Sequence, residues 1–258
     1  MLWHVDKTNF HILGSVHVSN RPLPISAETV RVLNRTTVLA FEANFDAAPN
    51  LAPAHYKADD SLSKNIPEPL FSDARRLWLE LGLSREEFER LRPWLAAFRL
   101  MNAVLSSRGF TGEQGIDRRV LDLGKKDNKT LFFLEQIDTG LMAFANAPRT
   151  EHETFLSRVA QHTEEGLQEV ESLILAWEMS NPDSLLPIVE RSLGLMPVTY
   201  SAALAGRNKL WLHHLLRFAR SERDTVAVVG MLHMVGPGSI PTLLAAAGYK
   251  CSIVTEST

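Results

Sequence analysis

Two turns of the same form lie near opposite ends of the 258-residue chain. In each, an apolar stretch is followed by a glycine, two further residues and a histidine, in residues 13–17 and 229–233. Glycine allows the backbone to bend sharply there and to expose the histidine ring. Neutral imidazole is a common ligand for Zn, Mn, Fe and Co. The paired turns therefore make His17 and His233 candidate metal ligands.

Two carboxylates stand at comparable places, directly after predicted strands. Residues 37–41 read as a buried strand that ends at Glu42, and residues 130–134 as a strand that ends at Glu135. Because ligands of open α/β sheets bind beyond the carboxyl ends of the strands, these glutamates and the two histidines are expected to meet. A metal held by two histidines and a glutamate could lower the pKa of a bound water towards neutrality, and a second carboxylate could act as the base.

Ordinary structural roles stay open for these polar residues. The two glutamates could be capping or surface carboxylates. Asp117 and Arg118 could be an exposed pair at a helix start, where a carboxylate interacts favourably with the helix dipole, and Arg207 with Asn208 could be a similar pair. The two turn histidines could also be satisfied core residues. Most of the other histidines are expected on the surface or on helix faces: His4, His11, His55, His152, His162, His213 and His214.

The predicted elements give an α+β fold. Each Gly-x-x-His turn follows a strand and precedes a helix and a second strand, which predicts two β-α-β units with parallel strands. Together these units would form a central mixed sheet, with a long helical insert between them over about residues 67–220. The chain is expected to form one domain, 1–258. The strands of the two units are residues 10–13, 37–41, 225–229 and 250–254.

Composition and charge limit the classes of partner. Apolar residues make up 45% of the chain, and the net charge of −3 gives no basic surface for nucleic acid. No apolar stretch reaches the length of a membrane span. The N-terminal residues 1–6 lack the pattern of a secretory signal, so the chain is expected in the cytoplasm, or in the periplasm or outside the cell if a signal has been removed. Cys251 is the single cysteine and is expected to be a buried structural thiol.

A set of short motifs occurs in order along the chain. They are residues 13–17, 41–42, 93–94, 112–117, 134–135, 207–208, 229–236 and 248–249. The ordered set resembles the TraB/PrgY/GumN family and its animal relatives, the Tiki proteins. The resemblance extends from Leu2 to Val254.

The resemblance implies a metal-dependent hydrolase, with peptide bonds as the expected target. Tiki proteins are described as metal-dependent proteases that favour Mn or Co, and Zn is a further candidate here. The predicted metal ligands are His17, Glu42 and His233. Glu42 could instead be the base that activates water. The other predicted catalytic residues are Glu135 as a second carboxylate, Arg207 to stabilise developing negative charge, and Asn208 as a hydrogen-bond donor.

A second function stays open, because the wider group is also compared with haem-binding proteins and with proteins that block peptide pheromones. The same cleft would then hold a peptide or haem without turnover. The expected partners are a peptide or another small-molecule substrate. A homodimer is open as an alternative to a monomer.

Overall fold

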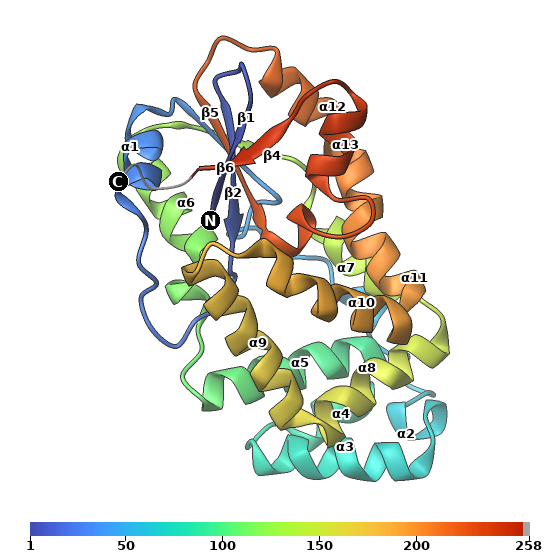
Figure 1. Cartoon of the computed structure of the whole chain (residues 1–258). Coiled ribbons are helices and arrows are strands. Elements are labelled where there is room, and N and C mark those ends of the chain that lie inside the picture. The colour runs from blue at the N-terminus through green and yellow to red at the C-terminus, as the bar shows by residue number, and fades with distance from the viewer. Residues whose placement is uncertain (255–258) are drawn as a thin grey trace.

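The centre of the fold is a six-stranded sheet with the strand order β4-β3-β5-β2-β1-β6 (Figure 1). The structure is a computed structural model and describes residues 1–254. The strands are β1 (Leu2–Val5), β2 (Phe10–Ser15), β3 (Val38–Phe41), β4 (Thr130–Phe133), β5 (Thr225–Gly230) and β6 (Cys251–Ile253).

The four strands from β4 to β2 run parallel, and β1 pairs antiparallel with both β2 and β6. Every residue of β2, β3 and β5 is buried. Such strands read as continuous apolar runs because both faces of a parallel sheet are covered. The predicted mixed sheet within an α+β fold is therefore confirmed, although β1 was not among the predicted strands.

The two β-α-β units are β2-α1-β3 and β5-α13-β6, where α1 is Ala27–Arg35 and α13 is Ile240–Ala246. The strands of each unit are parallel, as expected, but they are not neighbours. In the first unit β5 lies between β2 and β3. The two units therefore interleave, and the pairing of β2 with β5 places Ser15 opposite Gly230. Both Gly-x-x-His turns consequently begin at the same edge of the sheet.

The chain between β3 and β5 is mainly helical, but α6 and β4 return to the sheet in its middle. Figure 1 shows α3, α4, α5 and α8 at the end of the molecule furthest from the sheet. None of the helices in residues 1–254 is both long enough and apolar enough to cross a membrane. The helices of this stretch are α2 (Leu62–Asn65), α3 (Glu68–Glu80), α4 (Arg85–Arg90), α5 (Pro93–Ser107), α6 (Ile116–Lys126), α7 (Ile137–Ala145), α8 (Arg149–Gln161), α9 (Thr163–Glu178), α10 (Leu186–Leu195), α11 (Pro197–Tyr200) and α12 (Arg207–Ala219).

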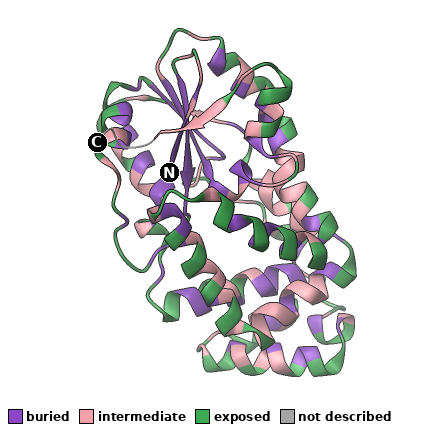
Figure 2. Cartoon of the chain, in the orientation of Figure 1, coloured by how far each residue is buried: buried purple, intermediate pink, exposed green. Residues whose placement is uncertain are grey.

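Two hydrophobic clusters hold these elements together. The larger one packs the sheet against α1, α6, α9, α12 and α13, and Figure 2 shows its central strands as buried, whereas β4 and β6 are only partly buried. The smaller one joins α2, α3, α4, α5 and α8. It is built around Phe88, whose ring lies 5.0 Å from that of Trp78 and 5.6 Å from that of Phe71. The helical stretch thus has a core of its own, while the boundaries predicted for the insert, 67–220, stay a prediction.

One histidine departs from the expected surface position. His11 lies in β2, is only 6% exposed, and stacks on the ring of His4 with 4.7 Å between ring centroids. Burial, together with the nearby His4 and Arg35, lowers the pKa of His11 to about 4. The folded protein therefore holds His11 neutral at pH values at which the unfolded chain is protonated.

We expect the free energy of unfolding to fall as the pH drops from about 6.5 to about 4, because the unfolded chain then binds a proton that the buried His11 does not. No stability is lost in this way above pH 6.5. The total loss on acidification amounts to about 3 kcal/mol, because each unit of pKa shift corresponds to about 1.4 kcal/mol. Urea titrations across this range measure it. His11→Phe should flatten the slope with pH, whereas His213→Phe at an exposed position should not. Equal slopes in the wild type and in His11→Phe would contradict the assignment.

Candidate functional site

The two Gly-x-x-His turns meet because β2 and β5 are neighbours. His17 follows the end of β2, and His233 lies on the 3-10 turn Met231–Met234 directly after β5. Gly230 has an ordinary φ of −54°, so the expected sharp bend is not the reason for a glycine here. A methyl group at Gly230 would lie 2.9 Å from His17 Nε2 and 3.3 Å from Glu42 Oε1. The glycine is required because these side chains approach the backbone closely.

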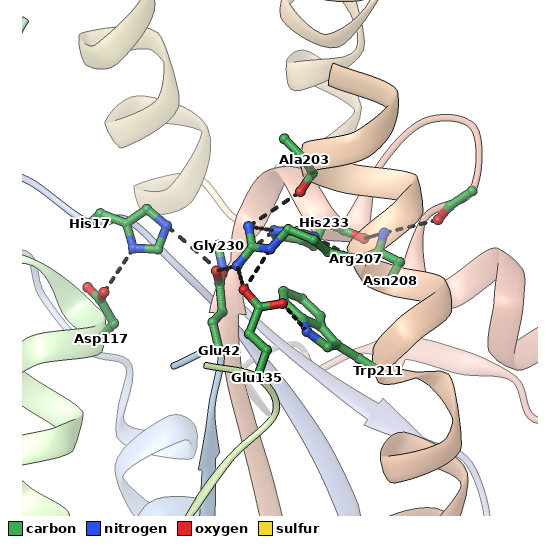
Figure 3. Close-up of polar contacts among 11 residues, drawn as sticks. His17, Glu42, Asp117, Glu135, Ala203, Arg207, Asn208, Trp211, Gly230 and His233 are labelled. Carbon is green, nitrogen blue, oxygen red and sulfur yellow. Dashed lines mark hydrogen bonds and ion pairs between the residues drawn. The ribbon is translucent and has the colours of Figure 1, made fainter. Parts of the chain in front are cut away.

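Glu42 is the carboxylate on which the two histidines converge (Figure 3). It comes directly after β3 and is 5% exposed. Its Oε1 accepts a hydrogen bond of 2.6 Å from the Gly230 backbone N–H. The same oxygen lies 4.0 Å from His17 Nε2 and 3.7 Å from His233 Nε2. One oxygen atom is thus shared by the two strand-end turns.

Each imidazole ring is fixed through its other nitrogen. His17 Nδ1 lies 2.8 Å from Asp117 Oδ2, and His233 Nδ1 lies 2.6 Å from Asn208 Oδ1. Because ionised carboxylate and amide oxygens only accept hydrogen bonds, Nδ1 carries the proton in both rings. The Nε2 atom of each ring therefore faces Glu42, and it carries a lone pair when the ring is neutral and a second proton when the ring is charged. Metal-binding histidines are held in the same way, by a carboxylate or carbonyl partner on the second nitrogen.

Arg207 joins the two strand-end glutamates. Its Nη2 donates to Glu42 Oε2 at 2.5 Å, and its Nε donates to Glu135 Oε1 at 2.9 Å. The other oxygen of Glu135 accepts from Trp211 Nε1 at 2.7 Å, and the guanidinium lies over the Trp211 ring. Arg207 Nη1 also lies 3.4 Å from His233 Nε2. The start of α12 is thereby tied to the ends of β3, β4 and β5.

The surroundings of the two histidines shift their pKa values in opposite directions. For His17, burial acts to lower the pKa, but the Asp117 carboxylate outweighs it and raises the pKa to about 9. For His233, burial and the nearby Arg207 lower the pKa to about 3. Burial would raise the pKa of Glu42, but the neighbouring histidines and Arg207 hold it at about 2. Glu42 is therefore a permanent carboxylate between one basic and one neutral ring.

His17 has the most exposed side chain of the cluster. The His17 side chain is 52% exposed, whereas those of Glu42, Glu135, Arg207 and His233 are 6%, 6%, 14% and 4% exposed. A ligand would therefore meet His17 first and the charged cluster behind it. Within residues 1–254, no group of three or more His, Cys, Asp or Glu side chains has the geometry of a metal-binding cluster.

The structure brings together all the predicted site residues. They are His17, Glu42, Glu135, Arg207, Asn208 and His233. Sequence reasoning missed Asp117 and Trp211 as members of the cluster. An exposed position beside Arg118 was left open for Asp117, but it is only 6% exposed, because α6 turns it towards His17. Its place in the 112–117 motif was the available signal. For Trp211 the signal was its spacing of four from Arg207, which puts both on one helix face.

We expect Arg207→Met to destabilise the fold by about 3–5 kcal/mol, because it leaves two buried carboxylates without their cation. The matched control is Arg21→Met. Arg21 pairs with Glu178 at 2.8 Å, but its side chain is 52% exposed, so its loss should cost at most about 1 kcal/mol. Urea unfolding of both variants measures the difference. Equal small losses would show that the buried pairing does not stabilise the fold.

Comparison with known proteins supports the family resemblance that the ordered motifs indicate. The chain matches the TraB/PrgY/gumN family over residues 1–253. It is 25% identical over 243 residues to the protein of Escherichia coli (strain K12) named "Uncharacterized protein YbaP", covering 92% of this chain and 88% of that protein. The protein of the same name from Shigella flexneri is 25% identical over 241 residues, covering 91% and 87%. The chain belongs to the TraB/PrgY/gumN family.

Proposed function

We propose that this protein is a metal-dependent hydrolase that acts on peptides. The proposed metal is Mn, Co or Zn, held by His17, Glu42 and His233. One observation carries the proposal: two imidazole Nε2 atoms face a single carboxylate oxygen, at 4.0 and 3.7 Å, and each ring is fixed at Nδ1 by an oxygen acceptor.

The donor atoms lie close to the spacing that a divalent cation requires, although in this arrangement they do not form a metal-binding cluster. Ligand bonds of about 2.0–2.2 Å place neighbouring donor atoms roughly 3–4 Å apart. The distances from Glu42 Oε1 to the two ring nitrogens are at the wide end of that range, so small side-chain movements would bring the donors together. His17 must lose a proton to bind a metal, and with both rings neutral the carboxylates of Glu42, Glu135 and Asp117 outnumber the single cation of Arg207, which leaves an excess of negative charge for a metal to balance.

When bound, a divalent cation supplies Lewis acidity, which lowers the pKa of a coordinated water and polarises a carbonyl group. Within the chain, Glu42 is better suited to hold a cation than to act as a base. Its pKa of about 2 makes it a weak base, and both of its oxygens already accept hydrogen bonds. The half-exposed His17 is the group that a peptide would reach first.

Glu135, Arg207 and Asn208 have different roles in this proposal. Arg207 places a buried positive charge beside the site, where it would stabilise negative charge developing on a carbonyl oxygen. Glu135 fixes that guanidinium and is a positioning residue. Asn208 donates to the His233 and Gly238 carbonyl oxygens and accepts from the His233 ring. Its donors are therefore occupied, and it orients His233.

A second candidate function is binding without turnover, of a peptide or of haem. The observation that favours it is that Glu42 and Arg207 are satisfied by their neighbours inside the protein. A buried carboxylate with a low pKa is also a poor proton acceptor. Metal dependence and the effect of removing the Glu42 charge separate the two functions.

We expect the purified protein to bind about one equivalent of Mn or Co and to cleave peptides only with the metal present. The His17→Ala/His233→Ala double variant should lose both properties, because two of the three ligands are gone. The control is His213→Ala/His214→Ala, which removes two histidines of α12 that lie outside the cluster. Elemental analysis and peptide cleavage with and without added metal are the measurements. If the wild type binds no metal and added metal stimulates no cleavage, the hydrolase proposal fails.

We expect Glu42→Gln to reduce turnover by about 10²-fold or more while peptide binding is retained, because the amide keeps the size of the side chain and removes the negative charge that would hold the metal. A protein that only binds would change little. Glu178→Gln, at a surface ion pair, is the control and should leave turnover unchanged. Rates and dissociation constants of the three proteins are compared. Unchanged turnover in Glu42→Gln would contradict a catalytic role for this carboxylate.

A further inference from the structure

A cavity of about 220 Å³ lies between the two hydrophobic clusters. Its wall combines Val104 and Leu167 of the larger cluster with Phe155 and Val159 of the smaller one. These side chains come from α5, α8 and α9, which lie together beyond the sheet in Figure 1. Cavities between separately packed units of a protein are common ligand sites. This one contains none of the charged site residues.

Two lining residues connect the cavity to the site. Leu232 precedes His233 on the 3-10 turn after β5. Tyr200 ends α11 and leads through the π-helical segment Ser201–Gly206 directly to Arg207. Such π-helical segments are rare and occur frequently at functional sites. A molecule seated in the cavity would therefore lie against the same two segments that carry His233 and Arg207.

The wall of the cavity favours an apolar occupant. Its charged residues already have partners: Arg158 donates to Glu169 at 2.9 Å, Glu169 also accepts from Arg191 at 3.0 Å, and His162 lies 3.1 Å from Glu165. The remaining lining is mostly aliphatic and aromatic. No unpaired charge in this wall requires a charged ligand, and an apolar group would gain from leaving water.

The size of the cavity limits the occupant to one side chain. Pockets for drug-sized ligands measure roughly 300–1,000 Å³, and this cavity of about 220 Å³ is smaller. A haem macrocycle therefore does not fit in it. A single leucine, methionine or phenylalanine side chain does.

We propose that this cavity is a specificity pocket, which receives one bulky apolar side chain of a peptide whose backbone lies across the site at His17 and His233. The cleavage of that peptide rests on the proposed hydrolase function. The binding of the side chain does not, because the cavity is formed by the hydrophobic clusters and contains no metal ligand.

Gly166 provides a direct way to fill the pocket. It lies on α9 in the cavity wall, and a Cβ atom added there meets no atom within 4 Å outside its own helix backbone and its chain neighbours. Gly194 on α10 has equally open surroundings but does not line the cavity. Leucine is a better helix former than glycine by roughly 0.5–1 kcal/mol. Gly166→Leu and Gly194→Leu should therefore both fold, and only the first should occupy the cavity.

The first measurement is binding of N-acetyl-leucinamide, followed by NMR titration. We expect the wild type to bind it more tightly than N-acetyl-glycinamide. Gly166→Leu should weaken binding about tenfold or more, while Gly194→Leu should bind as the wild type does. Equal binding of the two amides, absent binding, or full binding in Gly166→Leu would each overturn the pocket.

The second measurement is cleavage of matched peptides that carry leucine or glycine beside the scissile bond. The ratio of kcat/KM for leucine over glycine should fall about tenfold in Gly166→Leu and stay unchanged in Gly194→Leu. Cleavage without preference would overturn the pocket. Retained binding of N-acetyl-leucinamide with no cleavage under any metal would leave the pocket standing and refute the hydrolase, so the two failures can be told apart.

Discussion

The buried guanidinium of Arg207 is the group on which the rest of the site depends. Two carboxylates from the ends of neighbouring strands, Glu42 and Glu135, are brought together out of water, and such a pair is costly without a cation between them. To supply it, the start of α12 must lie at this edge of the sheet. That position also places Trp211 against Glu135 and Asn208 against His233. The need for a cation beside the two carboxylates thus fixes the position of α12, and Asn208 on α12 orients His233.

The second constraint is the pairing of β2 with β5. Strands from opposite ends of the chain become neighbours, with Ser15 opposite Gly230, because β5 is inserted between the two strands of the first β-α-β unit. Parallel strands end at the same edge, so the residues that follow them meet there. The polar cluster is therefore a consequence of interleaved topology, and it needs close approach of the backbone at Gly230.

The sequence alone could predict the features that depend on residues close to one another in the chain. The N-cap at Ser26, whose hydroxyl accepts from the Thr29 N–H, and the apolar strands that end in polar residues are set by neighbours in the chain. The burial of Asp117 is different, because it depends on α6 packing against the turn of His17. A side chain at Gly115 would come within 2.3 Å of the His17 carbonyl oxygen. Such contacts between distant segments leave no periodic pattern, which is also why the interleaved strand order was not predicted.

The distribution of polarity indicates how recognition would be divided. The donors and acceptors of Arg207, Asn208 and Glu42 are mostly used inside the protein, so the cluster has little capacity left to select a substrate by hydrogen bonds. Only the half-exposed His17 faces outward. Selectivity must then come from surfaces beside the cluster, and the cavity next to Leu232 is lined mainly by apolar groups. The apolar cavity would then fix one group of a ligand by the shape of that group. The rigid, charged cluster would hold the reactive group by charge.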